Sequence, residues 1–205
     1  RLVGSEMCIR DSMQLKQDAD GHDLDPADPD NWTVPTPIYR NDASLLNGNK
    51  QLAATASGGV GMSLDMTYFQ DADGRSYYAW QQLGSTYIAT MDPKDPAHVT
   101  SSPVRIVTPE YAWNAAIAEG PNVTLRDGKL YLMFSGSGVG KTYTTGLAVA
   151  DASGTDLTDP ASWTVLNYPI QKSGPFNGEM QLGTGHGMWS EDEDGNQIYV
   201  FHAYA

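Results

Sequence analysis

Length, composition and charge already exclude several classes of protein. The chain has 205 residues with 25 acidic and 12 basic side chains, which gives a formal net charge of −13. An acidic surface of this strength repels phosphate groups, so nucleic acids and anionic membranes are not expected partners, whereas a neutral carbohydrate is compatible with it. The single cysteine, Cys8, excludes an internal disulfide and a cysteine-based metal site, and no apolar run is long enough to cross a bilayer.

The first residues do not fit the rest of the chain. Residues 1–12, RLVGSEMCIRDS, share no pattern with the other residues and resemble a translated sequencing adaptor, so they are interpreted as a non-native leader. Residues 13–205 are predicted to form one domain, rich in Gly, Pro, Tyr and Trp, and this mixture favours short strands joined by tight turns. Residues 41–60 are polar and rich in Gly and Ala, which predicts a long loop.

A hairpin unit occurs three times along the domain. Each copy is an alternating apolar segment, a turn with an acidic residue before glycine, and a second alternating segment, which is a strong signal for two antiparallel strands. The copies align without gaps at residues 64–80, 118–134 and 185–201, and their turn glycines are Gly74, Gly128 and Gly195.

A second repeat follows the hairpins. Residues 18–38 match residues 151–170 around an Asp-Pro turn and a tryptophan, and residues 91–106 are a weaker copy. Further strands are expected at 86–91 and 144–150. Four strands per repeat are the signature of a propeller blade, so the sequence predicts an all-β propeller. Counting units gives about three blades, so the chain is interpreted as a piece of a ring that is cut at both ends.

The hairpin alignment brings three polar residues into one register. Asp65, Glu119 and His186 each stand nine positions before a turn glycine, on the strand that would lie innermost in its blade. They are therefore expected to begin adjacent inner strands and to face one central cavity; capping of strand ends is the alternative. Two carboxylates that share a cavity suit acid and base catalysis at a glycosidic bond, because each raises the pKa of the other.

Aromatic side chains that could stack on sugar rings are Trp80, Trp113 and Trp189, although each is also a candidate for the core. Other motifs are interpreted as turns. Residues 135–142, SGSGVGKT, approach a phosphate-binding loop but lack its first glycine and run into a strand-like segment. The Asp-x-Asp-Gly sequences lack the remaining ligands of a calcium loop, and His22, His98 and His202 have no metal-ligand spacing.

From Ser63 onward the chain resembles glycoside hydrolase family 43, a family of five-bladed propellers, and within it the exo-acting α-L-arabinofuranosidases. The resemblance covers roughly 140 residues. It is carried by the segments SLDMTYF (63–69), TPEYAWN (108–114), AEGP (118–121), DGKLYLMFSGSG (127–138), LTDPASWT (157–164), GTGHGMW (183–189) and VFHA (200–203).

The resemblance implies roles for the three inner residues. Glu119 would be the general acid, Asp65 would tune the pKa of that acid and help orient it, and His186 would lie at the propeller axis, where a calcium or other ion often binds. No cofactor is needed for the chemistry itself. The general base would precede Met13, because Asp28 aligns with the outer turn at Asp159 and is rejected as the base.

The implied activity is an inverting exo-glycosidase that releases arabinose from arabinan or arabinoxylan. A β-xylosidase of the same family and a non-catalytic glycan-binding propeller are the alternatives. The isolated piece is expected to be inactive, and an extracellular or periplasmic location is favoured. Ala118 and Gly187 stand where such enzymes more often carry asparagine, which leaves the sugar open.

Overall fold

The computed structural model describes residues 11–46 and 63–204, and in this part of the chain every regular element is a β-strand or a single 3₁₀ turn. The 3₁₀ turns are η2 (Pro29–Asn31), η3 (Ala112–Asn114) and η4 (Pro160–Ser162). No helix in these ranges is long and apolar enough to cross a membrane. The predicted leader and the loop at 41–60 lie mostly outside the described residues.

The first large sheet covers the first predicted hairpin and the strands after it. It is formed by β3 (Ser63–Gln70), β4 (Ser76–Gln82), β5 (Ser85–Asp92), β6 (Asp95–Val99) and β7 (Val104–Val107). The first four strands pair in chain order, and β7 pairs with β5. The predicted strand at 86–91 is thereby confirmed as part of β5.

The second and third sheets repeat the same hairpin. The second contains β8 (Ala118–Arg126), β9 (Lys129–Gly136), β10 (Thr144–Asp151) and β11 (Thr164–Val165), paired in chain order. The third contains β12 (Gly174–Phe176), β13 (Glu179–Glu191) and β14 (Gln197–Tyr204). The predicted strand at 144–150 is confirmed as β10, and residues 137–143 form the turn before it, not a phosphate-binding loop.

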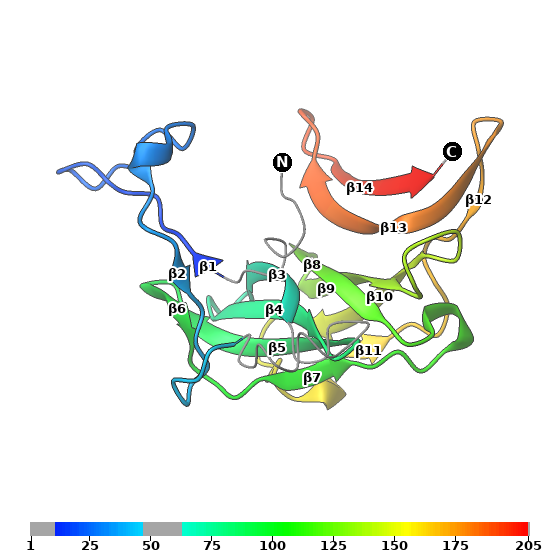
Figure 1. Ribbon diagram of the computed structural model, residues 1–205, viewed down its shortest axis with the longest axis horizontal. Helices are drawn as coiled ribbons and strands as arrows, with labels where there is room; N and C mark the ends of the chain where they lie inside the picture. The colour runs from blue at the N-terminus through cyan, green and yellow to red at the C-terminus, as the bar shows by residue number, and fades with distance from the viewer. Residues whose placement is uncertain (1–10, 47–62, 205) are drawn as a thin grey trace.

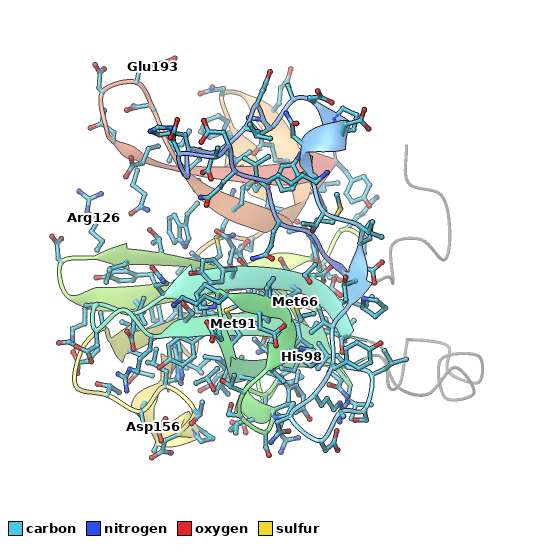
Figure 2. The ribbon with its side chains drawn as sticks, turned by 90° about the vertical axis from the view of Figure 1, so that its left-hand side faces the viewer. Met66, Met91, His98, Arg126, Asp156 and Glu193 are labelled. Carbon is cyan, nitrogen blue, oxygen red and sulfur yellow. The ribbon has the colours of Figure 1, made fainter. Side chains whose placement is uncertain are left out.

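The three hairpin turns have the predicted geometry. Gly74, Gly128 and Gly195 have φ angles of 80°, 74° and 76°, which a side chain disfavours. In the first and third turns, Asp71 and Asp192 use one carboxylate oxygen to accept two backbone N–H groups each, at 2.8–3.0 Å. These aspartates stabilise turns, as the sequence predicted. Figure 2 shows Arg126 and Glu193, which flank the second and third turns, on the same side of the molecule.

The sheets are stacked face to face. A core cluster joins the first sheet to the second, with Phe69, Tyr77, Ile88, Leu132, Phe134 and Trp163 among its members. The other face of the first sheet buries Tyr78, Trp80 and Met91 against Ile38 and Leu46. Neighbouring residues of β4 therefore point into different clusters, as expected for a strand buried on both faces.

The third sheet curves over the second on its opposite side (Figure 1). In contrast to the apolar contact between the first two sheets, this contact contains many cross-sheet hydrogen bonds. Trp189 donates from its backbone N–H to Asn122 Oδ1 at 2.8 Å and from its indole to the Tyr131 carbonyl at 3.2 Å. Successive sheets that each turn their first hairpin strand to one central side form a β-propeller, which confirms the predicted fold class. The number of blades in the closed ring stays a prediction.

The outer-turn repeat is confirmed at atomic detail. Asp28 and Asp159 each accept a backbone N–H at the start of a 3₁₀ turn, and the indoles of Trp32 and Trp163 each donate to a carbonyl six residues earlier at 3.0 Å. The equivalence of Asp28 with Asp159 supports its rejection as a general base. The weaker copy at 91–106 lacks the tryptophan and forms β6 and β7 instead of a 3₁₀ turn.

The segment before the first large sheet forms an arm. β1 (Asp11–Ser12) pairs with β2 (Thr36–Pro37), and bridges from Leu15 to Trp32 and from Gln17 to Asp23 extend the pairing outward. Figure 1 shows this arm, in blue, projecting from the body of the sheets. The arm begins with Asp11 and Ser12, which the sequence analysis assigns to the leader.

Candidate active site

Each inner strand is irregular at the residue that the repeat predicts. The pairing of β3 with β4 shifts register between Leu64 and Thr67, that of β8 with β9 between Glu119 and Asn122, and that of β13 with β14 between Gly185 and Met188. Such bulges bend a strand and redirect a side chain. All three inner residues lie at a bulge inside a strand, so the expectation that they begin their strands is wrong in detail for His186 of β13.

The bulges hold the backbone in the left-handed region. Asp65 has a φ of 56° and His186 a φ of 47°, and in the second sheet the same conformation falls one residue later, at Gly120 with 59°. A side chain in this region costs about 1 kcal/mol, so the surrounding contacts must hold these residues in place.

The bulges bring the three predicted residues together from three sheets. His186 Nε2 lies 3.8 Å from Asp65 Oδ1. The Gly120 N–H, in the peptide that follows Glu119, donates to Asp65 Oδ2 at 3.2 Å. The His186 N–H donates to the Ser135 hydroxyl oxygen on β9 at 2.7 Å. Asp65 therefore touches both the strand of Glu119 and the imidazole of His186, and the three residues share one side of the inner strands.

The pKa of Glu119 is raised above its ordinary value. Burial of the carboxyl group is the largest cause, and the negative charge of Asp65 adds to it. A hydrogen bond from Tyr143 and the positive charge that His186 can carry act in the opposite direction and lower the pKa. The sequence predicted repulsion between the two carboxylates, but removal from water is the stronger effect.

Tyr143 is the contact that the sequence did not reveal. Its hydroxyl donates to Glu119 Oε1 at 2.5 Å and lies 3.4 Å from His186 Nδ1. It is completely buried and precedes β10, on the turn that resembled a phosphate-binding loop. This turn belongs to neither repeat, so no register argument points to Tyr143.

Glycines of the third sheet make room for aromatic rings. A Cβ at Gly185 would lie 2.4 Å from Tyr143 Cδ1, and one at Gly187 would lie 2.1 Å from Tyr199 Cε2. The space beside Gly187 is thus filled by Tyr199, whose hydroxyl lies 2.5 Å from Thr145 Oγ1. Ala118 is fully buried, and its carbonyl accepts a hydrogen bond from Thr86 at 3.0 Å.

A Cβ at residue 185 would collide with the Tyr143 ring. Gly185→Ala should therefore destabilise the protein by about 1–3 kcal/mol, as overpacking of a core does. The matched control is Gly174→Ala in β12, where the new Cβ would meet nothing closer than the Lys172 carbonyl oxygen at 3.8 Å. Urea unfolding of the two variants checks this. Equal midpoints would show that the Tyr143 ring does not fill the space beside Gly185.

The three candidate tryptophans have different positions. Trp80 is fully buried in the cluster behind the first sheet, with its indole 3.2 Å from Gln82 Oε1, so its prediction as a sugar platform is wrong. Trp113 is partly buried, packs against the main core cluster and stacks on Tyr111 with ring centroids 6.1 Å apart. Trp189 lies between the second and third sheets. For Trp113 and Trp189 a role in substrate binding stays a prediction.

The residues around His186 do not by themselves form a calcium cage. Calcium takes six to eight oxygen ligands, whereas this histidine has the Asp65 carboxylate and the Tyr143 hydroxyl beside it. Within the described ranges, the one group of three side chains with metal-ligand distances is Asp18, Asp20 and His22, which is exposed on the arm. There Asp18 Oδ1 accepts the N–H groups of Asp20 and His22 at 2.9 Å, as turn aspartates do. The axial ion stays a prediction.

Fold and site together define a class: a β-propeller whose inner strands gather a partly buried carboxylic acid, a second carboxylate and an imidazole on one side. Comparison of the sequence gives the family. Residues 49–205 match the family model for glycosyl hydrolases family 43, and the chain belongs to this family.

Known proteins similar to the chain agree with this family. An extracellular exo-alpha-(1->5)-L-arabinofuranosidase of Streptomyces chartreusis is 32% identical over 153 residues, which is 69% of this chain and 44% of that protein. The chain thus spans less than half the length of this curated relative. The crystal structure of an alpha-L-arabinofuranosidase from Lactobacillus brevis superimposes with a TM-score of 0.66 at 25% identity, over 92% of this chain and 58% of the other.

An endo-1,4-beta-xylanase structure from Bacteroides thetaiotaomicron is also similar, with a TM-score of 0.59 at 26% identity over 69% of this chain and 49% of the other.

Proposed function

We propose that the full-length gene product containing this chain is an inverting exo-acting α-L-arabinofuranosidase, in which Glu119 is the general acid. The observation that carries the proposal is the environment of Glu119, a partly buried carboxyl group whose pKa is raised by that burial and by the nearby charge of Asp65. A raised pKa extends the protonated form of a carboxyl group to higher pH, and that form can donate its proton to a leaving oxygen. The arabinofuranosidases from Streptomyces chartreusis and Lactobacillus brevis support the choice of sugar.

The reaction needs two proton transfers on opposite faces of the sugar. Glu119 gives its proton to the glycosidic oxygen as the bond from that oxygen to the anomeric carbon breaks. Water attacks the anomeric carbon from the other face and loses its proton to a general base, so the configuration inverts. Among the described residues, the charged groups that act on Glu119 are Asp65 and His186. The general base is therefore proposed to come from another part of the gene product.

Asp65 is proposed to have two supporting roles. Its charge raises the pKa of Glu119, and its Oδ2 accepts the Gly120 N–H, which fixes the peptide next to the acid. The imidazole of His186, with Nε2 at 3.8 Å from Asp65 Oδ1, lies on the other side of this carboxylate. An axial ion near His186 is a further proposal, and no step of this mechanism passes through it.

A β-xylosidase is the second candidate, and the similarity of the chain to the endo-1,4-beta-xylanase structure supports it. A non-catalytic glycan-binding propeller is less favoured. Such a protein would repeat its binding residues in every blade, whereas the equivalent bulges here carry Asp, Glu and His.

The proposal is tested with the full-length gene product on 4-nitrophenyl α-L-arabinofuranoside and β-D-xyloside, with the first-formed anomer read by proton NMR. We expect the arabinofuranoside to be hydrolysed at least about tenfold faster, since one well-placed group is worth this factor, and β-L-arabinose to appear first. Faster release of xylose would favour the second candidate. Retention of configuration would contradict the single-displacement mechanism, and glycan binding without turnover would make the protein a lectin.

A further inference from the structure

The hydroxyl of Tyr143 lies between the Glu119 carboxyl group and the His186 imidazole. It donates to Glu119 Oε1 at 2.5 Å, and His186 Nδ1 is 3.4 Å away on the other side. His186 in turn faces Asp65 through Nε2. A continuous path of polar contacts therefore runs from Glu119 through Tyr143 and His186 to Asp65, across all three large sheets.

Two contacts from the third sheet hold the ring of Tyr143. His202 of β14 stacks on it with ring centroids 5.6 Å apart and an interplanar angle of 10°. Gly185 of β13 is in such close contact that a Cβ there would lie 2.4 Å from the ring. The hydroxyl of a fully buried, clamped ring has one position, so it holds whatever it binds in that position as well.

The hydroxyl has one proton and two possible acceptors. When Glu119 is ionised, the proton is directed at its carboxylate. When Glu119 carries its own proton, that proton can be donated to the phenol oxygen, so the contact between the two groups persists in both states of the carboxyl group. Burial and the neighbouring Glu119 raise the pKa of Tyr143, so the phenol keeps its proton in both states.

The groups that face this path come from every element around it. They are Asp65 of β3, Glu119 of β8, Ser135 of β9, and His186 and His202 of the third sheet. The hydrogen bond to the Glu119 carboxyl group itself comes from the Tyr143 hydroxyl.

We propose that Tyr143 is a positioning residue of the general acid: its clamped hydroxyl holds the Glu119 carboxyl group in the orientation for proton donation. The inference rests on the proposed function for its catalytic meaning, but the contact itself can be tested without turnover.

The test variant is Tyr143→Phe in the full-length gene product, which removes the hydroxyl and keeps the ring. Loss of a hydrogen bond to the ionised carboxylate should move the Glu119 titration, followed by carboxyl ¹³C NMR, to higher pH by roughly one unit. The alkaline limb of the pH profile of kcat/KM should move in the same direction. The value of kcat should fall about tenfold or more with little change in KM, because the hydroxyl is proposed to act through Glu119 and not on the substrate itself.

Tyr199→Phe is the matched control. The Tyr199 hydroxyl lies at the contact of the same two sheets, 2.5 Å from Thr145 Oγ1, with a pKa that burial raises as it does that of Tyr143. It has no contact with Glu119. We expect this variant to show the parent titration and pH profile, whatever its effect on stability. A second variant, Tyr143→3-fluorotyrosine, is nearly isosteric and makes the phenol a stronger donor, so the Glu119 titration should move to lower pH.

The possible outcomes are distinct. Opposite displacement of the Glu119 titration by phenylalanine and fluorotyrosine supports the inference. An unmoved titration in both variants, or an equal change in Tyr199→Phe, overturns it. If the titration moves as expected but the parent protein hydrolyses neither glycoside, the proposed function fails while the positioning role of Tyr143 stands.

Discussion

Glu119→Gln should lower kcat/KM of the full-length gene product by about 10²–10⁴ on substrates whose leaving group needs a proton, such as arabino-oligosaccharides. The structure gives the reason. The Glu119 carboxyl group is partly buried, its pKa is raised, and the amide that replaces it cannot donate a proton of comparable acidity. On 2,4-dinitrophenyl arabinofuranoside, which leaves without protonation, the loss should be about tenfold or less.

The control for this variant is Glu191→Gln, which changes an exposed residue at the end of the same strand that carries His186. It should retain the activity of the parent on both substrates. An equal loss on both substrates in Glu119→Gln would assign Glu119 a role in binding or in holding the site together, and the general acid would have to be sought elsewhere.

The geometry of the site could be predicted from the sequence wherever a repeat fixed the register. Asp65, Glu119 and His186 stand at one offset from their turn glycines because each hairpin has the same length from bulge to turn. Face-to-face sheets then bring equal positions together. The same logic correctly assigned Asp28 to an outer turn, where its carboxylate caps a 3₁₀ turn as Asp159 does.

The features that the sequence did not reveal come from contacts outside the repeats. Tyr143 reaches Glu119 from a turn that occurs in one sheet only, so alignment of the hairpins has no equivalent position for it. Trp80 was assigned to the sugar site on residue type alone. Its strand, β4, lies inside its sheet and is buried on both faces. The order of residues along a strand does not tell such a strand from one with an exposed face.

The cause of the raised pKa of Glu119 also needed the structure. Two acidic residues in register predicted repulsion, which depends on the distance between their charges. Burial depends instead on everything that covers the group, here including the Tyr143 ring and the glycine-rich third sheet that packs on it. The residues of one strand do not show how far neighbouring sheets exclude water from a carboxyl group on that strand.

The chain of residues 1–205, assayed alone, should release arabinose at less than about one thousandth of the rate of the full-length gene product, because loss of a general base alone costs 10²–10⁴. Inverting hydrolysis needs that base on the face of the sugar opposite Glu119. In the described part of the chain, the nearby candidates are already engaged on the acid's own side. Asp65 accepts the Gly120 N–H, and His186 lies against Asp65 and Tyr143.

The assay compares both proteins at equal concentration on 4-nitrophenyl α-L-arabinofuranoside, whose product is easily measured at low turnover. Circular dichroism of the shorter protein must show β structure, so that inactivity is not simply failure to fold. Adding Glu119→Gln to it should then change nothing, since the step that Glu119 assists would no longer be completed by activated water. A rate within tenfold of the full-length product would mean that the base lies within residues 13–205, and Asp65 would be the first residue to test in that role.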